Sequence, residues 1–127
     1  IDRLGMGAFE SWRAARLVVD TGIHEQGWTR EEAIAFMKAN TPLAENNIRN
    51  EVDRYVTWPG QALGYKTGQI EIWRLRRRAE EALGDAFDLR GFHDVVLGGG
   101  SVTLPVLGRR VDRWVSQNKR ASGSAPE

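Results

Sequence analysis

The sequence predicts an all-α protein with five or six helices. Apolar residues recur every three or four positions along most of the 127-residue chain, which is the period of an amphipathic helix. Alternating stretches of β-branched residues are almost absent, and the chain has only four prolines. Capping residues and glycine-containing turns separate the periodic segments.

Three helices are predicted in the first half of the chain. The first covers about residues 8–20, with Phe9, Trp12 and Val19 on one face, and Thr21 and Gly22 end it. Residues 29–32 (TREE) form a capping box that begins a second helix reaching about residue 40.

Thr41 and Pro42 are predicted to begin the third helix, as N-cap and first-turn proline. This helix should end at residues 58–60 (WPG). Its predicted buried residues are Ile48, Val52, Tyr55 and Val56.

The second half is predicted to contain one long helix, over about residues 61–83, and two shorter ones. One face of the long helix passes from polar and small residues to the apolar Ile72, Leu75 and Ala79. Asp88 caps the next helix, residues 98–101 (GGGS) form a flexible joint, and residues 103–105 begin the last helix.

Composition excludes several classes of site. The chain has no cysteine, so disulfides, cysteine-ligated zinc and cysteine nucleophiles are excluded, and it has only two histidines. With 18 Lys and Arg against 17 Asp and Glu, the formal charge of +1 does not indicate a polyanion as partner. No apolar run approaches the roughly 18–20 residues of a membrane span. The compartment stays open between cytoplasm, periplasm and secretion.

The chain begins at Ile1 rather than Met, and we expect it to be a fragment of a longer protein or a processed product. We expect a helical domain over residues 1–115. Residues 116–127 (SQNKRASGSAPE) are polar and low in complexity, which predicts a disordered tail.

Three short motifs resemble functional sites, but each is better explained as an ordinary structural feature. His24 and Glu25 resemble the start of a zinc-binding His-Glu-x-x-His helix, but position 28 is Trp, so no metal site is predicted. The glycine-rich residues 98–101 lack a preceding strand and a following lysine, which favours a loop over a phosphate site. Glu71, Glu80 and Glu81 flank the arginines of residues 74–78 and neutralise most of their charge, which favours a solvated helix face over nucleic-acid binding.

Arg16 lies among apolar residues of its predicted helix, where a free charge would be costly. Either it binds an anion or a carboxylate while Asp20 orients it, or it forms a structural ion pair with Asp20. The residues alone favour the structural ion pair.

Gln61, Tyr65 and Gln69 share one helix face with Gly64 and Gly68 between them. Glycine costs a helix about 1 kcal/mol relative to alanine, so we expect another helix or a substrate to approach this face. A tyrosine hydroxyl can donate to an oxyanion, and a glutamine can hold a peptide backbone. His24 can do either, or transfer a proton.

Several segments resemble the C-terminal part of the bacterial "domain of unknown function 885" family. They are residues 13–24 (RAARLVVDTGIH) with Trp28, residues 51–55 (EVDRY), residues 58–69 (WPGQALGYKTGQ), residues 92–97 (FHDVVL) and Leu104 with Pro105. The match extends over nearly the whole chain except the tail.

That family is similar to α-helical zinc peptidases of the gluzincin kind, whose metal motif lies N-terminal to the matched region. The resemblance therefore implies the C-terminal, substrate-side part of a larger zinc-peptidase-like fold. It implies zinc in the full-length protein, no cofactor in this fragment, and two partners: the missing N-terminal portion and a peptide-like substrate. By the same resemblance, His24 and Tyr65 are candidate catalytic residues, and Arg16, Gln61 and Lys66 are candidate substrate-binding residues.

The alternative prediction is a non-catalytic helical module for binding or assembly. A fragment should expose apolar surface that its missing part would cover, and should therefore tend to self-associate. No nucleic-acid or membrane partner is expected.

Overall fold

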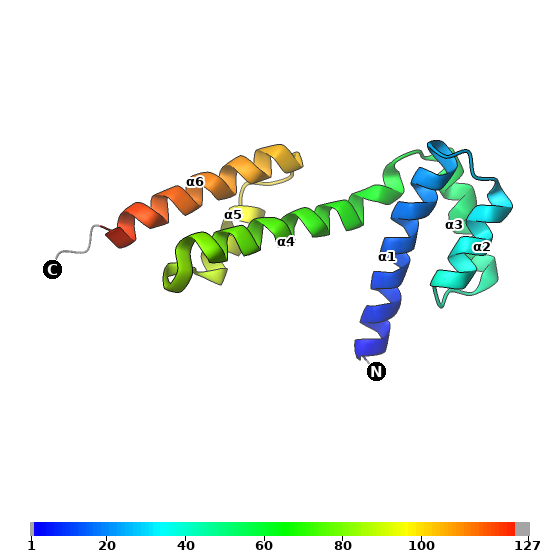
Figure 1. Ribbon diagram of the computed structural model, residues 1–127, viewed down its shortest axis with the longest axis horizontal. Helices are drawn as coiled ribbons and strands as arrows, with labels where there is room; N and C mark the ends of the chain where they lie inside the picture. The colour runs from blue at the N-terminus through cyan, green and yellow to red at the C-terminus, as the bar shows by residue number, and fades with distance from the viewer. Residues whose placement is uncertain (1, 124–127) are drawn as a thin grey trace. The chain divides into compact units, whose positions relative to one another are not determined.

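The computed structural model describes residues 2–123. In that range it contains six α-helices, two short 3-10 helices and no strand (Figure 1). The predicted all-α class with five or six helices is confirmed. The chain forms two compact units, one up to Thr67 and one from Gly68, where the sequence suggested a single helical domain over residues 1–115.

The first unit is built on helix α1 (Asp2–His24). This helix contacts α2 (Arg30–Asn40), α3 (Glu45–Thr57) and the 3-10 helix η1 (Gln61–Leu63) (Figure 1). The buried core of the unit consists of Ala15, Val19, Ala33, Ile34, Met37, Ile48, Val52, Tyr55 and Ala62.

The second unit contains most of α4 (Gly64–Leu83), η2 (Gly84–Ala86), α5 (Leu89–Leu97) and α6 (Leu104–Gly123). Its buried core consists of Leu75, Ala79, Phe92, Leu107 and Val111. None of the helices in the described residues combines the length and the apolarity that crossing a membrane would require.

Helix α1 extends beyond the predicted residues 8–20 at both ends, and Thr21 and Gly22 do not end it. The Thr21 hydroxyl donates to the Leu17 carbonyl inside the helix. A Cβ on Gly22 would lie 2.4 Å from the Trp28 ring, so glycine is needed for packing rather than for a break. The helix instead ends before Gly27, whose φ of 70° favours glycine.

The predicted capping box of α2 is confirmed. The Thr29 hydroxyl accepts from the Glu32 backbone N–H at 3.3 Å, and the Glu32 carboxylate accepts from the Thr29 N–H at 2.7 Å. The prediction that Thr41 and Pro42 begin α3 is wrong, because α3 begins at Glu45. Thr41 ends α2 instead, and both its N–H and its hydroxyl donate to the Met37 carbonyl.

Burial along α3 and α4 follows the predicted stripes, with one exception in each helix. Ile48, Val52 and Tyr55 are buried as predicted, but Val56 is 45% exposed. In α4, Leu75 and Ala79 are buried whereas Ile72 is 37% exposed. Both exceptions lie at the edge of the stripe, where period alone cannot define how wide the packed face is.

Asp88 caps α5 as predicted, accepting from the N–H groups of Arg90 and Gly91. A disordered tail was predicted from residue 116 onward, but α6 continues through residues 116–123. Ser116 and Asn118 donate back to helix carbonyls one turn earlier, so these polar residues extend the helix instead of leaving it. Residues 124–127 lie outside the described residues.

Candidate functional site

The side chain of Arg16 lies in a box of three aromatic rings in the first unit. Arg16 is only 5% exposed. Its Cζ lies 5.0 Å from the ring centroid of Tyr65, 5.5 Å from that of Tyr55 and 5.6 Å from that of Trp12. Guanidinium–ring contacts at this range are attractive, and they strengthen when water is excluded.

The polar groups of Arg16 are only partly satisfied. Its Nη2 donates to Gln61 Oε1 at 3.3 Å, while its buried Nε has no hydrogen-bond partner in the part of the chain that the structure describes. The predicted Arg16–Asp20 pair is wrong. Both Asp20 oxygens accept instead from the Gly60 N–H, at 3.0 and 3.1 Å, because the left-handed turn at Gly60 presents that N–H to Asp20.

A hydrogen-bond network leads away from Arg16 through Gln61. Gln61 Oε1 also accepts from Arg54 Nη1 at 2.6 Å, and Arg54 makes two hydrogen bonds to Glu51, at 2.6 and 3.2 Å. The Tyr55 hydroxyl donates to Glu51 at 2.7 Å and accepts from Trp12 Nε1 at 3.2 Å.

The hydrogen-bond network determines the protonation states of the groups around Arg16. Burial favours the neutral form of Glu51, but the hydrogen bonds from Arg54 and Tyr55 and the charges of Arg54 and Arg16 outweigh it, and the pKa of Glu51 falls. Burial and the hydrogen bond to Glu51 raise the pKa of Tyr55. At neutral pH Glu51 is thus an anion engaged by Arg54, and Arg16 has no carboxylate of the described residues within salt-bridge distance.

Tyr65 forms the exposed wall of the box. It is 55% exposed, and a second guanidinium, that of Arg13, lies 5.7 Å from the same ring. The Tyr65 hydroxyl has no hydrogen-bond partner among the residues that the structure describes. This side of the unit therefore combines two cations with an available donor, which suits an anionic ligand.

Two of the predicted site residues are engaged outside the box. His24 Nε2 lies 2.9 Å from the Tyr55 carbonyl and donates to it, which satisfies one of the last carbonyls of α3. Lys66 pairs with Glu10 at 2.7 Å. The structure thus brings Arg16, Gln61 and Tyr65 together and holds the other two by contacts of their own.

Four residues of this site were not among those predicted from the sequence: Trp12, Glu51, Arg54 and Tyr55. A local signal was present, because Glu51 stands three and four positions before Arg54 and Tyr55, the spacing of neighbours on a helix. Tyr55 was correctly predicted as a core residue, but the sequence did not show that its ring also faces Arg16.

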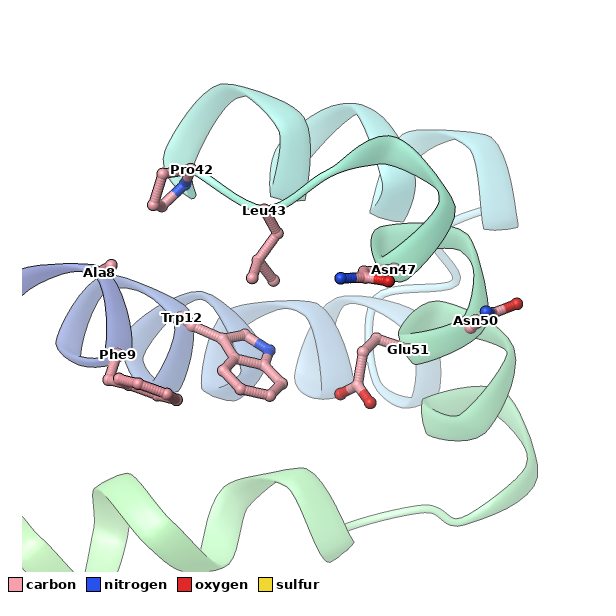
Figure 2. Close-up of a pocket in the computed structure, with 8 residues that line it drawn as sticks. All are labelled: Ala8, Phe9, Trp12, Pro42, Leu43, Asn47, Asn50 and Glu51. Carbon is pink, nitrogen blue, oxygen red and sulfur yellow. The ribbon is translucent and has the colours of Figure 1, made fainter. Parts of the chain in front are cut away.

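A pocket of about 420 Å³ opens beside this network (Figure 2). Its apolar wall includes Phe9 and Trp12 of α1 and Leu43 of the loop before α3, and Glu51 closes the polar end. Figure 2 shows the Leu43 and Trp12 side chains facing each other across it. Trp12 and Glu51 therefore belong to both the pocket and the network.

The described residues contain no cluster of three or more His, Asp or Glu side chains that could hold a metal ion. His24 donates a hydrogen bond to a backbone carbonyl, and the ionised Glu51 carboxylate accepts hydrogen bonds from Arg54 and Tyr55. The residues present in this part of the chain do not fit a zinc site.

Among solved structures, the chain is similar to a putative lipoprotein from Colwellia psychrerythraea. The two are 53% identical with a TM-score of 0.82, over 84% of this chain and 18% of that one. The chain thus spans about a fifth of the length of that solved relative. No curated protein matches it. Residues 1–111 match the family model described as bacterial protein of unknown function (DUF885), and the chain belongs to this family.

Proposed function

We propose that this chain is the C-terminal, substrate-side segment of a zinc-dependent peptidase or related amide hydrolase, in which Arg16 binds a carboxylate of a peptide-like substrate. One observation carries the proposal. Arg16 is only 5% exposed, its guanidinium lies among three rings, and its buried Nε has no hydrogen-bond partner among the described residues.

Burying a charge without an opposite charge beside it costs several kcal/mol of stability. Such a group is therefore a candidate for ligand binding or catalysis. A carboxylate can accept from two N–H groups of one guanidinium at once, which gives geometric specificity as well as affinity. The aromatic rings exclude water and strengthen that interaction.

The other predicted residues receive roles in the same proposal. The Tyr65 hydroxyl donates to the substrate carbonyl or its oxyanion. Gln61 uses its Oε1 to hold Arg16 and Arg54, which leaves its amide N–H groups for a substrate backbone carbonyl. Lys66, which pairs with Glu10 at 2.7 Å, would exchange that partner for the substrate backbone or carboxylate. His24 acts either on the substrate or by fixing the end of α3 beside Tyr55.

In this proposal, residues outside this chain hold the zinc of the longer protein. The 127-residue chain alone should not cleave a peptide library in the presence of zinc. Reproducible, chelator-sensitive cleavage by the chain would contradict this part of the proposal.

The kinetics of a longer protein that carries this segment test the assignment. Arg16→Gln should lower kcat/KM by about 10–100-fold for a peptide with a free carboxylate, and change it little for the same peptide with an amide terminus. Tyr65→Phe and His24→Ala should each reduce kcat more than about tenfold. Arg49→Gln, which removes an arginine paired with Glu45 on α3, is the matched control for the loss of one positive charge, and unchanged kinetics in the first three variants would overturn the assignment.

One observation favours the alternative, a non-catalytic module for assembly. Several large apolar side chains are more than half exposed: Met6, Phe9, Trp58, Tyr65, Ile70, Trp73 and Leu97. Light scattering should then show self-association of the chain that grows with concentration. A clean monomer at high concentration would count against it.

A further inference from the structure

We propose that the pocket beside Trp12 binds the apolar side chain of the residue whose carboxylate Arg16 binds. The substrate class is then a peptide, or an acylated amino acid, with an aromatic or large aliphatic C-terminal residue. This inference rests on the proposed carboxylate-binding role of Arg16.

The pocket has the size and the lining for such a side chain. Its volume of about 420 Å³ lies within the range of small-molecule sites. Phe9, Trp12 and Leu43 give it an apolar wall from two different segments of the chain, and Phe9 lies 6.0 Å from Trp12 between ring centroids. A phenyl or isobutyl group inserted there would gain burial against both segments.

Trp12 joins the pocket to the carboxylate site. One indole lines the pocket and also lies 5.6 Å from the guanidinium of Arg16, one helical turn further along α1. Its Nε1 is held by the Tyr55 hydroxyl, which fixes the orientation of the ring. Trp12 is thus shared by the pocket and by the rings around Arg16, so the proposed side-chain and carboxylate sites are neighbours.

Glu51 restricts which side chain fits. Its carboxylate lies at the polar end of the pocket and is ionised at neutral pH, so it repels an acidic side chain. Arg54 and Tyr55 already occupy its oxygens, so it offers little to a basic one. A neutral apolar side chain is the class that remains.

Four probes distinguish binding in the apolar pocket from binding of the carboxylate by Arg16 in the 127-residue chain. They are N-acetylphenylalanine, N-acetylleucine, N-acetylglycine and N-acetylphenylalaninamide. Binding is measured by calorimetry. We expect the phenylalanine and leucine probes to bind about tenfold or more tightly than the glycine probe, because only they fill the pocket. The amide should bind about tenfold or more weakly than its acid.

Two variants locate the pocket. Ala8 lines it and Ala14 is exposed elsewhere on α1, so Ala8→Phe should fill the pocket while Ala14→Phe is its matched control. Ala8→Phe should lower the affinity for N-acetylphenylalanine to that for N-acetylglycine, and should not change the affinity for N-acetylglycine. Ala14→Phe should leave the affinities for both probes unchanged. Both substitutions add a ring at a helix position that is not part of the buried core, so folding is retained.

The outcomes distinguish the two proposals. If the acid is preferred over the amide but phenylalanine is not preferred over glycine, the pocket proposal fails and the carboxylate site stands. If acid and amide bind alike, or if Arg16→Lys leaves the preference for the acid intact, the carboxylate site fails. If Ala14→Phe weakens the phenylalanine probe as much as Ala8→Phe does, the probe binds elsewhere and the pocket proposal is overturned.

Discussion

Arg16 is buried without an acidic partner among the described residues, although burial of a charge normally requires one. The sequence predicted its burial from its apolar neighbours on the helix. It did not predict its partners, because they come from α3, η1 and the start of α4, and because Asp20 is taken by the Gly60 turn.

A residue kept for binding rather than for stability should be replaceable without loss of stability. Arg16→Met should leave the free energy of unfolding unchanged within about 1 kcal/mol, or raise it, because removal of the buried charge offsets the lost attraction to the three rings, and Gln61 keeps its hydrogen bond from Arg54. Urea denaturation measures this. A loss of about 3–5 kcal/mol would assign Arg16 a structural role instead.

Asp20 provides the contrasting case. Asp20→Ala should destabilise the chain by about 1–3 kcal/mol, because it leaves the Gly60 N–H without its acceptor. The same urea denaturation checks it, and an unchanged midpoint would show that water replaces the carboxylate at that turn.

Glu51 should give the first unit part of its acid sensitivity. Its folded pKa lies below the unfolded value, so its contribution is present above the unfolded value near 4.5 and is lost as pH falls through the lowered value. Glu51→Gln should therefore flatten the dependence of stability on pH below about 4.5. Thermal unfolding between pH 2 and 7 measures the effect, and parallel curves for the variant and the parent would contradict it.

At the scale of elements, predictions succeeded where the signal was local. The capping box at residues 29–32 and the Asp88 cap both depend on residues within one turn. The predicted break at Thr21 and Gly22 was wrong because the reason for the glycine is tertiary: the Trp28 ring packs on it.

Two glycines inside helices should respond in opposite directions to alanine. Gly22→Ala should destabilise by about 1–3 kcal/mol, because its Cβ would collide with Trp28. Gly68→Ala should stabilise by about 0.5–1 kcal/mol, because an added Cβ would meet no described atom within 4 Å apart from its chain neighbours and the backbone of its own helix. Thermal unfolding of both variants checks the pair, and a stabilised Gly22→Ala would show that α1 ends before residue 22, as the sequence first suggested.

At the scale of the whole chain, periodicity and composition predicted the all-α class, and the family match confirms the family that the motifs suggested. The division into two units was not predicted, because α4 runs through the boundary without a linker or a change in composition. Of the five predicted site residues, the three that meet come from α1, η1 and the start of α4, so only the folded chain shows that they form one site.

The most direct test of the carboxylate-binding role of Arg16 is NMR of the arginine side-chain Nε–H groups during titration with N-acetylphenylalanine. Arg16→Lys assigns the Arg16 signal by removing it. We predict that this signal shifts strongly and that its exchange with water slows as the carboxylate binds, while the signal of Arg49, which pairs with Glu45 on α3, moves little. Binding that leaves the Arg16 signal in place, or that persists unchanged in Arg16→Lys, would contradict the proposed function.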